Sequence, residues 1–472
     1  MAVRTGPVTA PSQHTALDDV AIAELSRHFR GALIRPGDAP YDAARRIWNG
    51  AIDRRPALIA RCTGAADVRA AVGFARELVV AVRGGGHNVA GTAVCDGGVV
   101  IDLSPMKGIW VDPRARVARA QPGLLWGEFD HETQPFGLAA PGGIVSHTGI
   151  AGLTLGGGLG WLMRRHGLTA DNLISADVVT ADGALVRASA DEHADLFWGL
   201  RGGGGNFGIV TSFEYRLHAV GPTVLAGLIL YPAARAREVL SSYRDYITSA
   251  PDELMTIVVL RKAPPAPFLP EKVHGQPVVI IAVCCAGSVE EGERAVAPLR
   301  RFGEPLADLV RPTPYASHQA LIDASVPHGL GYYWKSEYLR PLSDTLIDTL
   351  VAHAWRAPTP ESYAAVFHMG GAVGREDPEG SAFEDRRAAH AMTMDAVWSE
   401  PAASEACIAW ARGFWEAVRP FSTGRVYMNF LGEEGEDRVR AAYGPTKYER
   451  LRALKRKYDP TNFFRMNQNI VP

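Results

Sequence analysis

The sequence predicts an α+β protein built from two unlike parts, and three observations support this fold class. The chain has 472 residues, which is too long for a single core, so we expect more than one domain. Residues 1–217 alternate short apolar strands with helices and are dense in glycine. Residues 218–430 carry longer apolar strands between amphipathic helices, as in an antiparallel sheet flanked by helices.

The first part opens with a strand–helix–strand unit that ends at a glycine cluster. An apolar strand is expected at residues 56–62, a helix at 66–77 and a second strand at 78–82. Another strand at 99–103 and a helix at 123–133 follow. Two strands paired around Asp182 and Gly183, at 173–180 and 184–188, and a strand at 209–217 complete this part.

The second part has regularly spaced apolar strands and few glycine clusters. Strands are expected at residues 225–231, 255–260, 278–283, 363–369 and 391–398. Helices are expected at residues 234–247, 289–300 and 343–357. The tail from residue 448 is basic and helical before a final asparagine-rich segment.

Composition excludes several function classes. The formal net charge is −2 and no basic block stands out, so we expect no nucleic-acid partner. No run approaches 18 apolar residues and the N-terminus lacks the apolar core of a signal peptide, so we expect a cytoplasmic protein without a membrane partner. Five cysteines without paired spacings argue against a disulfide framework and a thiolate zinc site, and no metal site is expected.

Three glycine clusters are the most informative feature of the chain. Gly84, Gly85 and Gly86 follow a strand and precede His87 and Asn88, so their N–H groups can form a nest that suits a diphosphate. The other clusters lie at residues 142–160 and 202–205. Ordinary turns do not need four consecutive glycines, whereas close approach of backbone to a large flat ligand does. A flavin dinucleotide would suit such a site.

A nicotinamide-binding fold fits the clusters poorly. Its fingerprint needs a strand before the glycines and a helix after them. The first cluster here is followed by a loop, and the third leads directly into a strand. Taken alone, each cluster could still be a set of tight turns.

Several ordered motifs resemble those of a known family. They are residues 36–38 with Tyr41, 47–50, 83–87, 121–123, 149–152, 156–160, 195–198, 201–208, 334–336, 458–464 and 467–469. On these motifs the chain resembles the berberine bridge enzyme-like FAD-linked oxidases, within the vanillyl-alcohol-oxidase type (PCMH-type) flavoproteins, over nearly its whole length. The resemblance implies a two-part FAD-binding domain, residues 1–217 and 431–472, and a substrate-binding domain over residues 218–430.

The resemblance also implies the cofactor and how it is held. His87 falls where the family attaches FAD covalently through the flavin 8α carbon. The cysteine of a second link would fall at Val145, so a single histidyl link is expected. The other residues expected to bind FAD are Arg83, Gly84, Gly85, Gly86, Asn88, Gln121, Pro122, Gly123, Thr148, Gly149, Gly152, Gly157, Gly160, Ile209, Val210, Asn467, Gln468 and Asn469.

The implied reaction moves a hydride from a small organic alcohol, amine or secondary-metabolite intermediate to the flavin, and dioxygen then takes the electrons to give hydrogen peroxide. Tyr427 and His368 are the expected proton acceptors, because Tyr427 matches a family tyrosine placed over the flavin and a histidine titrates near neutrality. Glu361 is a weaker candidate, and Tyr333 could line the pocket. Thr148 falls beside the flavin's reactive edge, where a small side chain leaves room for dioxygen.

Alternatives stay open at this point. The same flavoprotein could be a dehydrogenase with a non-oxygen acceptor, or a non-catalytic ligand-binding protein on this fold. His147 and His166 flank the second glycine cluster and could contact flavin or substrate, although they could equally be loop histidines with ordinary partners. The sequence does not identify the substrate or the oligomeric state.

Overall fold

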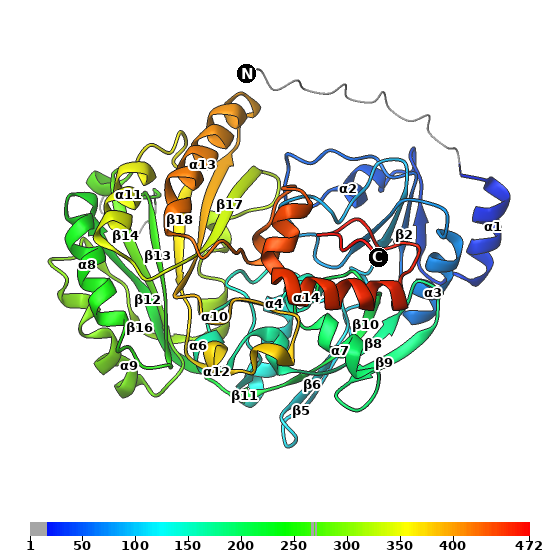
Figure 1. Cartoon of the computed structure of the whole chain (residues 1–472), viewed down its shortest axis with the longest axis horizontal. Coiled ribbons are helices and arrows are strands. Elements are labelled where there is room, and N and C mark those ends of the chain that lie inside the picture. The colour runs from blue at the N-terminus through cyan, green and yellow to red at the C-terminus, as the bar shows by residue number, and fades with distance from the viewer. Residues whose placement is uncertain (1–16, 266–268, 270) are drawn as a thin grey trace.

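A computed structural model describes residues 17–265, 269 and 271–472 and has an α+β fold with two lobes (Figure 1). One lobe combines the N-terminal residues with the C-terminal helix, and the other is a large sheet covered by helices. The predicted fold class is confirmed. The boundaries at residues 217 and 430 stay a proposal; β10 (Ile209–Arg216) belongs to a sheet of the first lobe and β12 (Thr223–Pro232) to the large sheet.

The first sheet has four strands in the order β1-β2-β4-β3. β2 (Leu58–Arg61), β4 (Val99–Asp102) and β3 (Val80–Arg83) are parallel, and β1 (Ala32–Ile34) is antiparallel to β2. The continuous apolar runs of β2 and β4 fit a sheet buried on both faces. Helices α1 (Asp19–His28) and α3 (Ala65–Phe74) pack together beside it.

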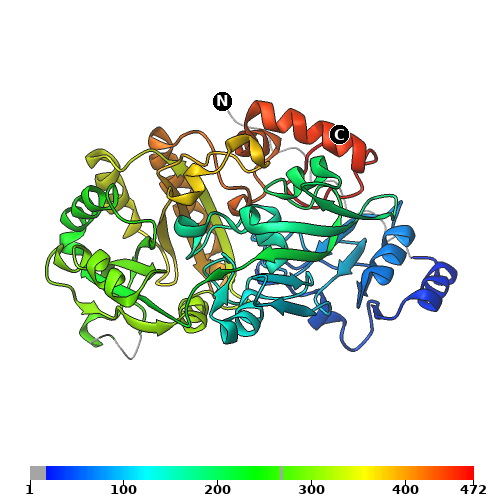
Figure 2. The same ribbon diagram turned by 90° about the horizontal axis from the view of Figure 1, so that it is seen from below.

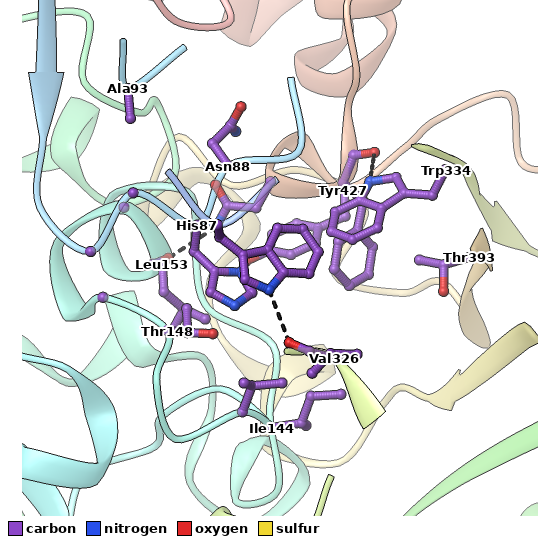
Figure 3. A pocket seen from close by; sticks show the side chains of 18 of the residues that line it. His87, Asn88, Ala93, Ile144, Thr148, Leu153, Val326, Trp334, Thr393 and Tyr427 are labelled. Carbon is purple, nitrogen blue, oxygen red and sulfur yellow. Dashed lines mark hydrogen bonds between the residues drawn. The ribbon is translucent and has the colours of Figure 1, made fainter. Parts of the chain in front are cut away.

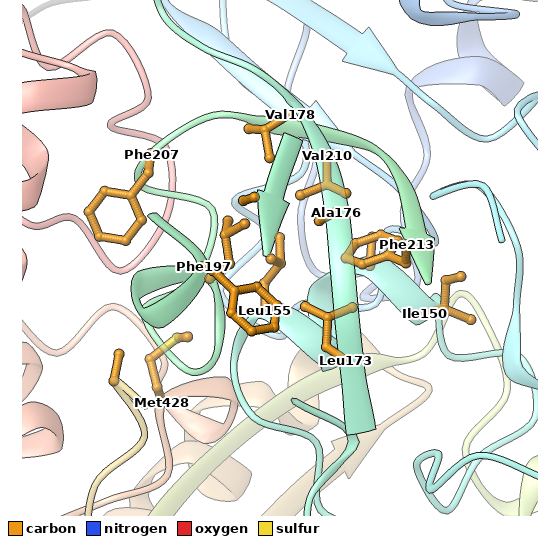
Figure 4. Packing of buried hydrophobic residues seen from close by; sticks show 14 of the residues in the cluster. Ile150, Leu155, Leu173, Ala176, Val178, Phe197, Phe207, Val210, Phe213 and Met428 are labelled. Carbon is orange, nitrogen blue, oxygen red and sulfur yellow. The ribbon is translucent and has the colours of Figure 1, made fainter. Parts of the chain in front are cut away.

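The second sheet is antiparallel, with the order β5-β6-β10-β8-β9. Its other strands are β5 (Ile109–Asp112), β6 (Val117–Ala120), β8 (Leu173–Val179) and β9 (Leu185–Ser189). Phe197, Phe207, Phe213 and Val210 form its core (Figure 4). Helix α7 (Ala194–Leu200) packs on α14 (Glu436–Tyr458), so the C-terminal segment returns to this lobe (Figure 1).

The large sheet has the order β15-β12-β14-β13-β18-β19-β17, with β16 also paired to β12. Its remaining strands are β13 (Leu254–Lys262), β14 (Pro277–Cys285), β15 (Ala307–Asp308), β16 (Arg311–Pro314), β17 (Gly331–Leu339), β18 (Tyr363–His368) and β19 (His390–Trp398). Helices α8 (Ala236–Ile247), α9 (Val289–Val296), α11 (Asp344–Ala354) and α13 (Ser404–Val418) cover one face (Figures 1 and 2).

Strand alternation gives the two faces of the large sheet different neighbours. In β18, Ala364 and Val366 belong to the core under the helices. Ala365 and Phe367 belong to a separate cluster on the opposite face, which is turned toward the first lobe. Both faces are apolar, so burial alone does not reveal which one a ligand would meet.

Shorter elements connect these layers. They are α2 (Tyr41–Arg45), α4 (Trp126–Thr133), β7 (Leu138–Ala139), α5 (Ile150–Leu155), α6 (Met163–His166), β11 (His218–Ala219), α10 (Tyr315–Gln319) and α12 (Ala372–Arg375). Within the described ranges, no helix combines the length and apolarity needed to cross a bilayer.

Most predicted elements are confirmed to within a few residues, including the strand before the first glycine cluster and the apolar strands of the large sheet. The expected helix at 289–300 is shorter, because α9 ends at Val296 and a 3-10 turn follows. The sequence missed β17, whose partly exposed centre interrupts the apolar pattern expected of a strand.

Candidate functional site

A cavity of about 810 Å³ lies between the two lobes (Figure 3). Its volume is in the upper part of the range for ligand pockets. On one side it is lined by the three glycine segments and the C-terminal tail. On the other side it is lined by side chains of β12, β13, β14, β17, β18 and β19.

Two glycine segments form the floor of the cavity in direct backbone contact. A Cβ atom at Gly85 would lie 2.5 Å from the Cα of Gly149, and one at Gly149 would lie 2.5 Å from the nitrogen of Gly85. Gly86 adopts a φ of +68°, which side chains disfavour. A flat ligand can therefore lie against bare backbone here.

His87 projects from this floor into the cavity (Figure 3). Trp48 stacks on its ring, with centroids 4.3 Å apart and planes inclined by 14°. Its Nε2 atom lies 3.2 Å from Nδ1 of His147. Burial lowers the pKa of His87 to about 3, and the neighbouring His147 and His328 act in the same direction. His87 is therefore neutral at pH 7, with a lone pair on one ring nitrogen.

The third glycine segment and the C-terminal tail close the cavity at its other end. Asn206 donates to the carbonyls of Gly203 and Gln468, and its own side-chain oxygen accepts from the backbone of Ile470. Asn467 donates to the carbonyl of Gly205. These bonds explain why a segment more than 250 positions away completes the wall.

Most of the residues expected to bind the cofactor line this cavity. They are Gly84, Gly85, Gly86, His87, Asn88, Thr148, Gly149, Gly152, Ile209, Val210, Asn467 and Gln468. Trp48, Thr92, Asn206 and Met466 also line it and were missed. A glycine floor without room for side chains, flanked by polar amides, fits the flat ring and the polar chain of FAD.

Four residues expected to bind the cofactor have structural roles behind the floor instead. Arg83 forms a buried ion pair with Asp102, at 2.7 Å. The Gln121 side chain accepts a hydrogen bond from the backbone of Gly108. The carbonyl of Pro122 packs behind Gly84, and Gly123 lies against the carbonyls of residues 103–106. These residues support the glycine turn and do not line the cavity.

Three further predictions of cofactor contact are not supported. Gly157 packs against the ring of Phe383, and Gly160 packs against the carbonyl of Gly142. Asn469 lies just past the lining residues of the tail. Glycine repeats at residues 156–160 thus serve close packing between loops.

The prediction that His368 meets the substrate is wrong. It follows Phe367 in β18 and points to the opposite face, so Phe367 lines the cavity and His368 does not. Its Nε2 lies 3.0 Å from the guanidinium of Arg164. Burial, together with this cation, lowers the pKa of His368 to about 2. Tyr333 is also excluded: Trp334 lines the cavity, while the Tyr333 hydroxyl accepts from Arg412.

Tyr427 lines the cavity, but its hydroxyl is occupied (Figure 3). It accepts hydrogen bonds from the backbone nitrogen of Gly158 and from Asn429, both at 2.8 Å. Burial raises the pKa of Tyr427 to about 12. Tyr427 is therefore a protonated phenol at pH 7, which suits positioning rather than proton removal.

Asp395, which the sequence did not single out, is the acidic group of the cavity. It lies on β19 with Thr393 on the same face, and both line the cavity. One carboxylate oxygen, Oδ2, has no hydrogen-bond partner among the described residues. Burial raises the pKa of Asp395 to about 7, although hydrogen bonding with Thr393 and Tyr363 opposes that rise. Such a carboxyl can take up a proton near neutrality.

The remaining cavity surface is mainly hydrocarbon. Strand residues that line it include Leu228, Ile257, Val259, Ile280, Ala282, Ala365 and Phe367. Arg261 and Tyr363 supply the polar contacts next to Asp395, with the Arg261 guanidinium 5.7 Å from the centre of the Tyr363 ring. Glu361 is not among the lining residues.

The lining contains no cysteine among the described residues. Val145 lines the cavity near His87. The five cysteines are free and buried elsewhere in the described chain. Thr148 follows His147 in sequence and lines the cavity, and its carbonyl accepts a hydrogen bond from the backbone nitrogen of Trp126.

Comparison with known proteins assigns the two ends of the chain to flavoprotein families. Residues 56–189 match the family profile described as FAD binding domain. Residues 426–471 match the profile described as Berberine and berberine like.

Relatives match over nearly the whole chain. (R)-6-hydroxynicotine oxidase of Paenarthrobacter nicotinovorans is 33% identical over 94% of this chain and 97% of its own length. An FAD-linked oxidoreductase of Dictyostelium discoideum is 32% identical over 96% of this chain and 97% of its own length.

Solved structures share the fold. The crystal structure of 6-hydroxy-D-nicotine oxidase from Arthrobacter nicotinovorans superposes with a TM-score of 0.86, at 32% identity over 94% of this chain and 98% of that one. Xylooligosaccharide oxidase from Myceliophthora thermophila superposes with a TM-score of 0.83 over 96% and 99% of the two chains, at 23% identity, and shares the fold alone.

Proposed function

The chain belongs to the berberine bridge enzyme-like FAD-linked oxidoreductases, and from this premise we propose that it is an oxidase of a small, largely apolar alcohol, amine or secondary-metabolite intermediate. The observation that carries the proposal is the cavity, which joins a glycine floor bearing His87 to a sheet face bearing Asp395. FAD bound there supplies hydride acceptance and electron transfer to dioxygen.

His87 is proposed as the single covalent tether of the flavin. Its ring is neutral, faces the cavity and is held in place by the stacked Trp48. Val145 cannot form a thioether, and no cysteine lines the cavity within the described residues. These observations support one histidyl link and give no support to a second link.

Asp395 is proposed as the proton acceptor for the substrate hydroxyl or amine. It replaces the two residues expected from the sequence, since His368 faces away and Tyr427 is a weak base with its hydroxyl engaged. A pKa of about 7 suits a general base that works near neutral pH. The hydrocarbon lining beside it favours apolar substrates over oligosaccharides, which need many hydrogen-bond partners.

The proposal is tested by following flavin absorbance in two steps. Aryl and alkyl alcohols and amines are mixed anaerobically with the purified protein in a stopped-flow instrument, with xylobiose as the sugar control. Reduction by an apolar member of the panel, followed by rapid reoxidation in air-saturated buffer, is the expected result. Slow reoxidation would make the protein a dehydrogenase with another acceptor, and reduction by the sugar alone would overturn the substrate class.

The tether is tested on denatured protein. After acid precipitation, the flavin should stay in the pellet of the unmodified protein and enter the supernatant for His87→Ala. A pellet of His87→Ala that retains flavin would place the attachment at another residue.

A further inference from the structure

A second histidine, His147, contacts His87 through a defined pair of ring nitrogens. Nε2 of His87 and Nδ1 of His147 are 3.2 Å apart, although the residues are 60 positions apart in sequence. We propose that His147 is a positioning residue for flavin attachment, which accepts the proton that His87 gives up when it bonds to the flavin. This inference rests on the proposed tether at His87.

The contact determines which nitrogen of His87 is free to react. Nε2 is engaged with His147, so Nδ1 is the nitrogen left for a new bond. A neutral imidazole carries a lone pair on Nδ1 only when its proton is on Nε2. His147 can hold that tautomer by accepting from Nε2–H with its own Nδ1. Its other nitrogen, Nε2, has no hydrogen-bond partner in the described part of the chain, so nothing opposes this arrangement.

Both rings are held in place from independent sides. Trp48 stacks on His87, and its indole N–H donates to the carbonyl of Val326 at 3.0 Å. On the other side, Ser146 binds the Asp323 carboxylate through its backbone nitrogen, at 2.9 Å, and through its hydroxyl. This places a carboxylate next to His147.

The electrostatics fit a transient proton acceptor. Burial lowers the pKa of His147, while the charge of Asp323 acts in the opposite direction. His147 is thus neutral before attachment and can accept a hydrogen bond. A proton that reaches it is then stabilised by the Asp323 carboxylate.

The chemistry balances as follows. A bond forms between Nδ1 of His87 and the flavin 8α carbon, while one C–H bond of that carbon and the Nε2–H bond of His87 break. The C–H proton goes to solvent and the imidazole proton goes to His147. The two electrons of the broken C–H bond remain in the flavin ring, and dioxygen takes them up with two protons to give hydrogen peroxide.

Neither a metal site nor a role for His328 accounts for the histidine cluster as well. Within the described residues, no group of three or more His, Cys, Asp and Glu side chains could hold a metal ion. His328 is also near, with its ring centre 6.4 Å from that of His87 in an edge-on geometry, but no hydrogen bond joins the two in the described structure. His328 is therefore a matched control for His147.

The experiment follows covalent attachment rather than turnover. Protein is produced under riboflavin limitation, FAD is added, and samples are acid-precipitated over time to measure flavin in the pellet and the mass of the chain. His147→Ala should bind FAD, as seen by quenched flavin fluorescence, but attach it about 100-fold more slowly. Attachment in His147→Ala should accelerate with added imidazole and with rising pH, which a merely structural defect would not do. His328→Ala should match the unmodified protein.

The outcomes separate this inference from the tether itself. If His147→Ala attaches flavin at the unmodified rate, the role of His147 is overturned and the tether stands. If the unmodified protein attaches none, or His87→Ala attaches it, the tether and this inference both fail. His147→Asn is measured in parallel in case the alanine variant does not bind FAD; attachment at the unmodified rate in His147→Asn would also overturn the role, because an amide cannot take up the proton.

Discussion

Tyr363 and Asp395 are direct cross-strand partners in the antiparallel pair of β18 and β19, so both side chains stand on the face of the sheet that lines the cavity. On the other side of Tyr363, its partner in β13 is Arg261. A cation, a phenol and a carboxyl thus form a row across three neighbouring strands. The hydrocarbon lining around the row makes this the polar end of the substrate space.

Replacing Asp395 by Asn should slow flavin reduction by about 100-fold, because the substrate proton loses its acceptor. The change keeps the shape of the side chain, so flavin content should be unaffected. Anaerobic stopped-flow measurement of the flavin absorbance gives the rate. A rate within twofold of the unmodified protein would remove Asp395 from proton transfer.

The same carboxyl predicts a pH dependence of reduction. Because burial raises the pKa of Asp395 to about 7, the group is protonated and unable to accept a proton below that pH. The rate of reduction should therefore fall about tenfold for each pH unit below 7 and become constant above it. In Asp395→Asn this dependence should disappear. A profile that declines as pH rises through 7 would assign the limiting group to an acid instead.

Tyr427→Phe should affect stability more than chemistry. The change removes the acceptor of two buried donors, the backbone nitrogen of Gly158 and the Asn429 amide, and each unsatisfied donor costs about 1–3 kcal/mol. We expect a lower melting temperature and a reduction rate that falls less than in Asp395→Asn. Thermal unfolding and stopped-flow reduction, measured on both variants, distinguish this role from that of a base, which would give the opposite order.

Gly85→Ala should prevent flavin binding by pushing the two glycine segments apart. The added Cβ would lie 2.5 Å from the Cα of Gly149, and overpacking of this kind costs about 1–3 kcal/mol. The purified variant should lack visible flavin absorbance. Gly73→Ala in helix α3, where nothing lies within 4 Å, is the control and should retain flavin. Equal flavin content in the two variants would contradict the proposed floor.

The sequence could predict the glycine floor because glycine clusters carry a local signal. The turn at Gly84–Gly86 and its histidine follow from the preceding strand and the residue types alone. The contact between Gly85 and Gly149 could not be predicted, since it joins segments far apart in the chain. For the same reason, the bond between His87 and His147 left no local trace.

The proton acceptor was missed for a different reason. In β18 both faces are apolar, so the sequence cannot say whether Phe367 or His368 meets the cavity, and a shift by one residue exchanges them. Asp395 did leave a signal, because Thr393 and Asp395 alternate with apolar residues in a strand that is otherwise hydrophobic. A carboxyl at such a position calls for a polar partner or a function.

Thr148 should control the reaction with dioxygen rather than with substrate. It lines the cavity at the edge of the glycine floor, and the family resemblance places it beside the reactive edge of the flavin, where bulk excludes dioxygen. Thr148→Leu should slow reoxidation of reduced flavin several-fold and leave anaerobic reduction within about twofold, whereas Thr148→Val, of nearly equal shape, should retain both rates. Mixing reduced protein with air-saturated buffer in the stopped-flow instrument measures reoxidation directly. If the leucine variant reoxidises as fast as the valine variant, dioxygen reaches the flavin by another route, and the small side chain at residue 148 has no part in the oxidase activity.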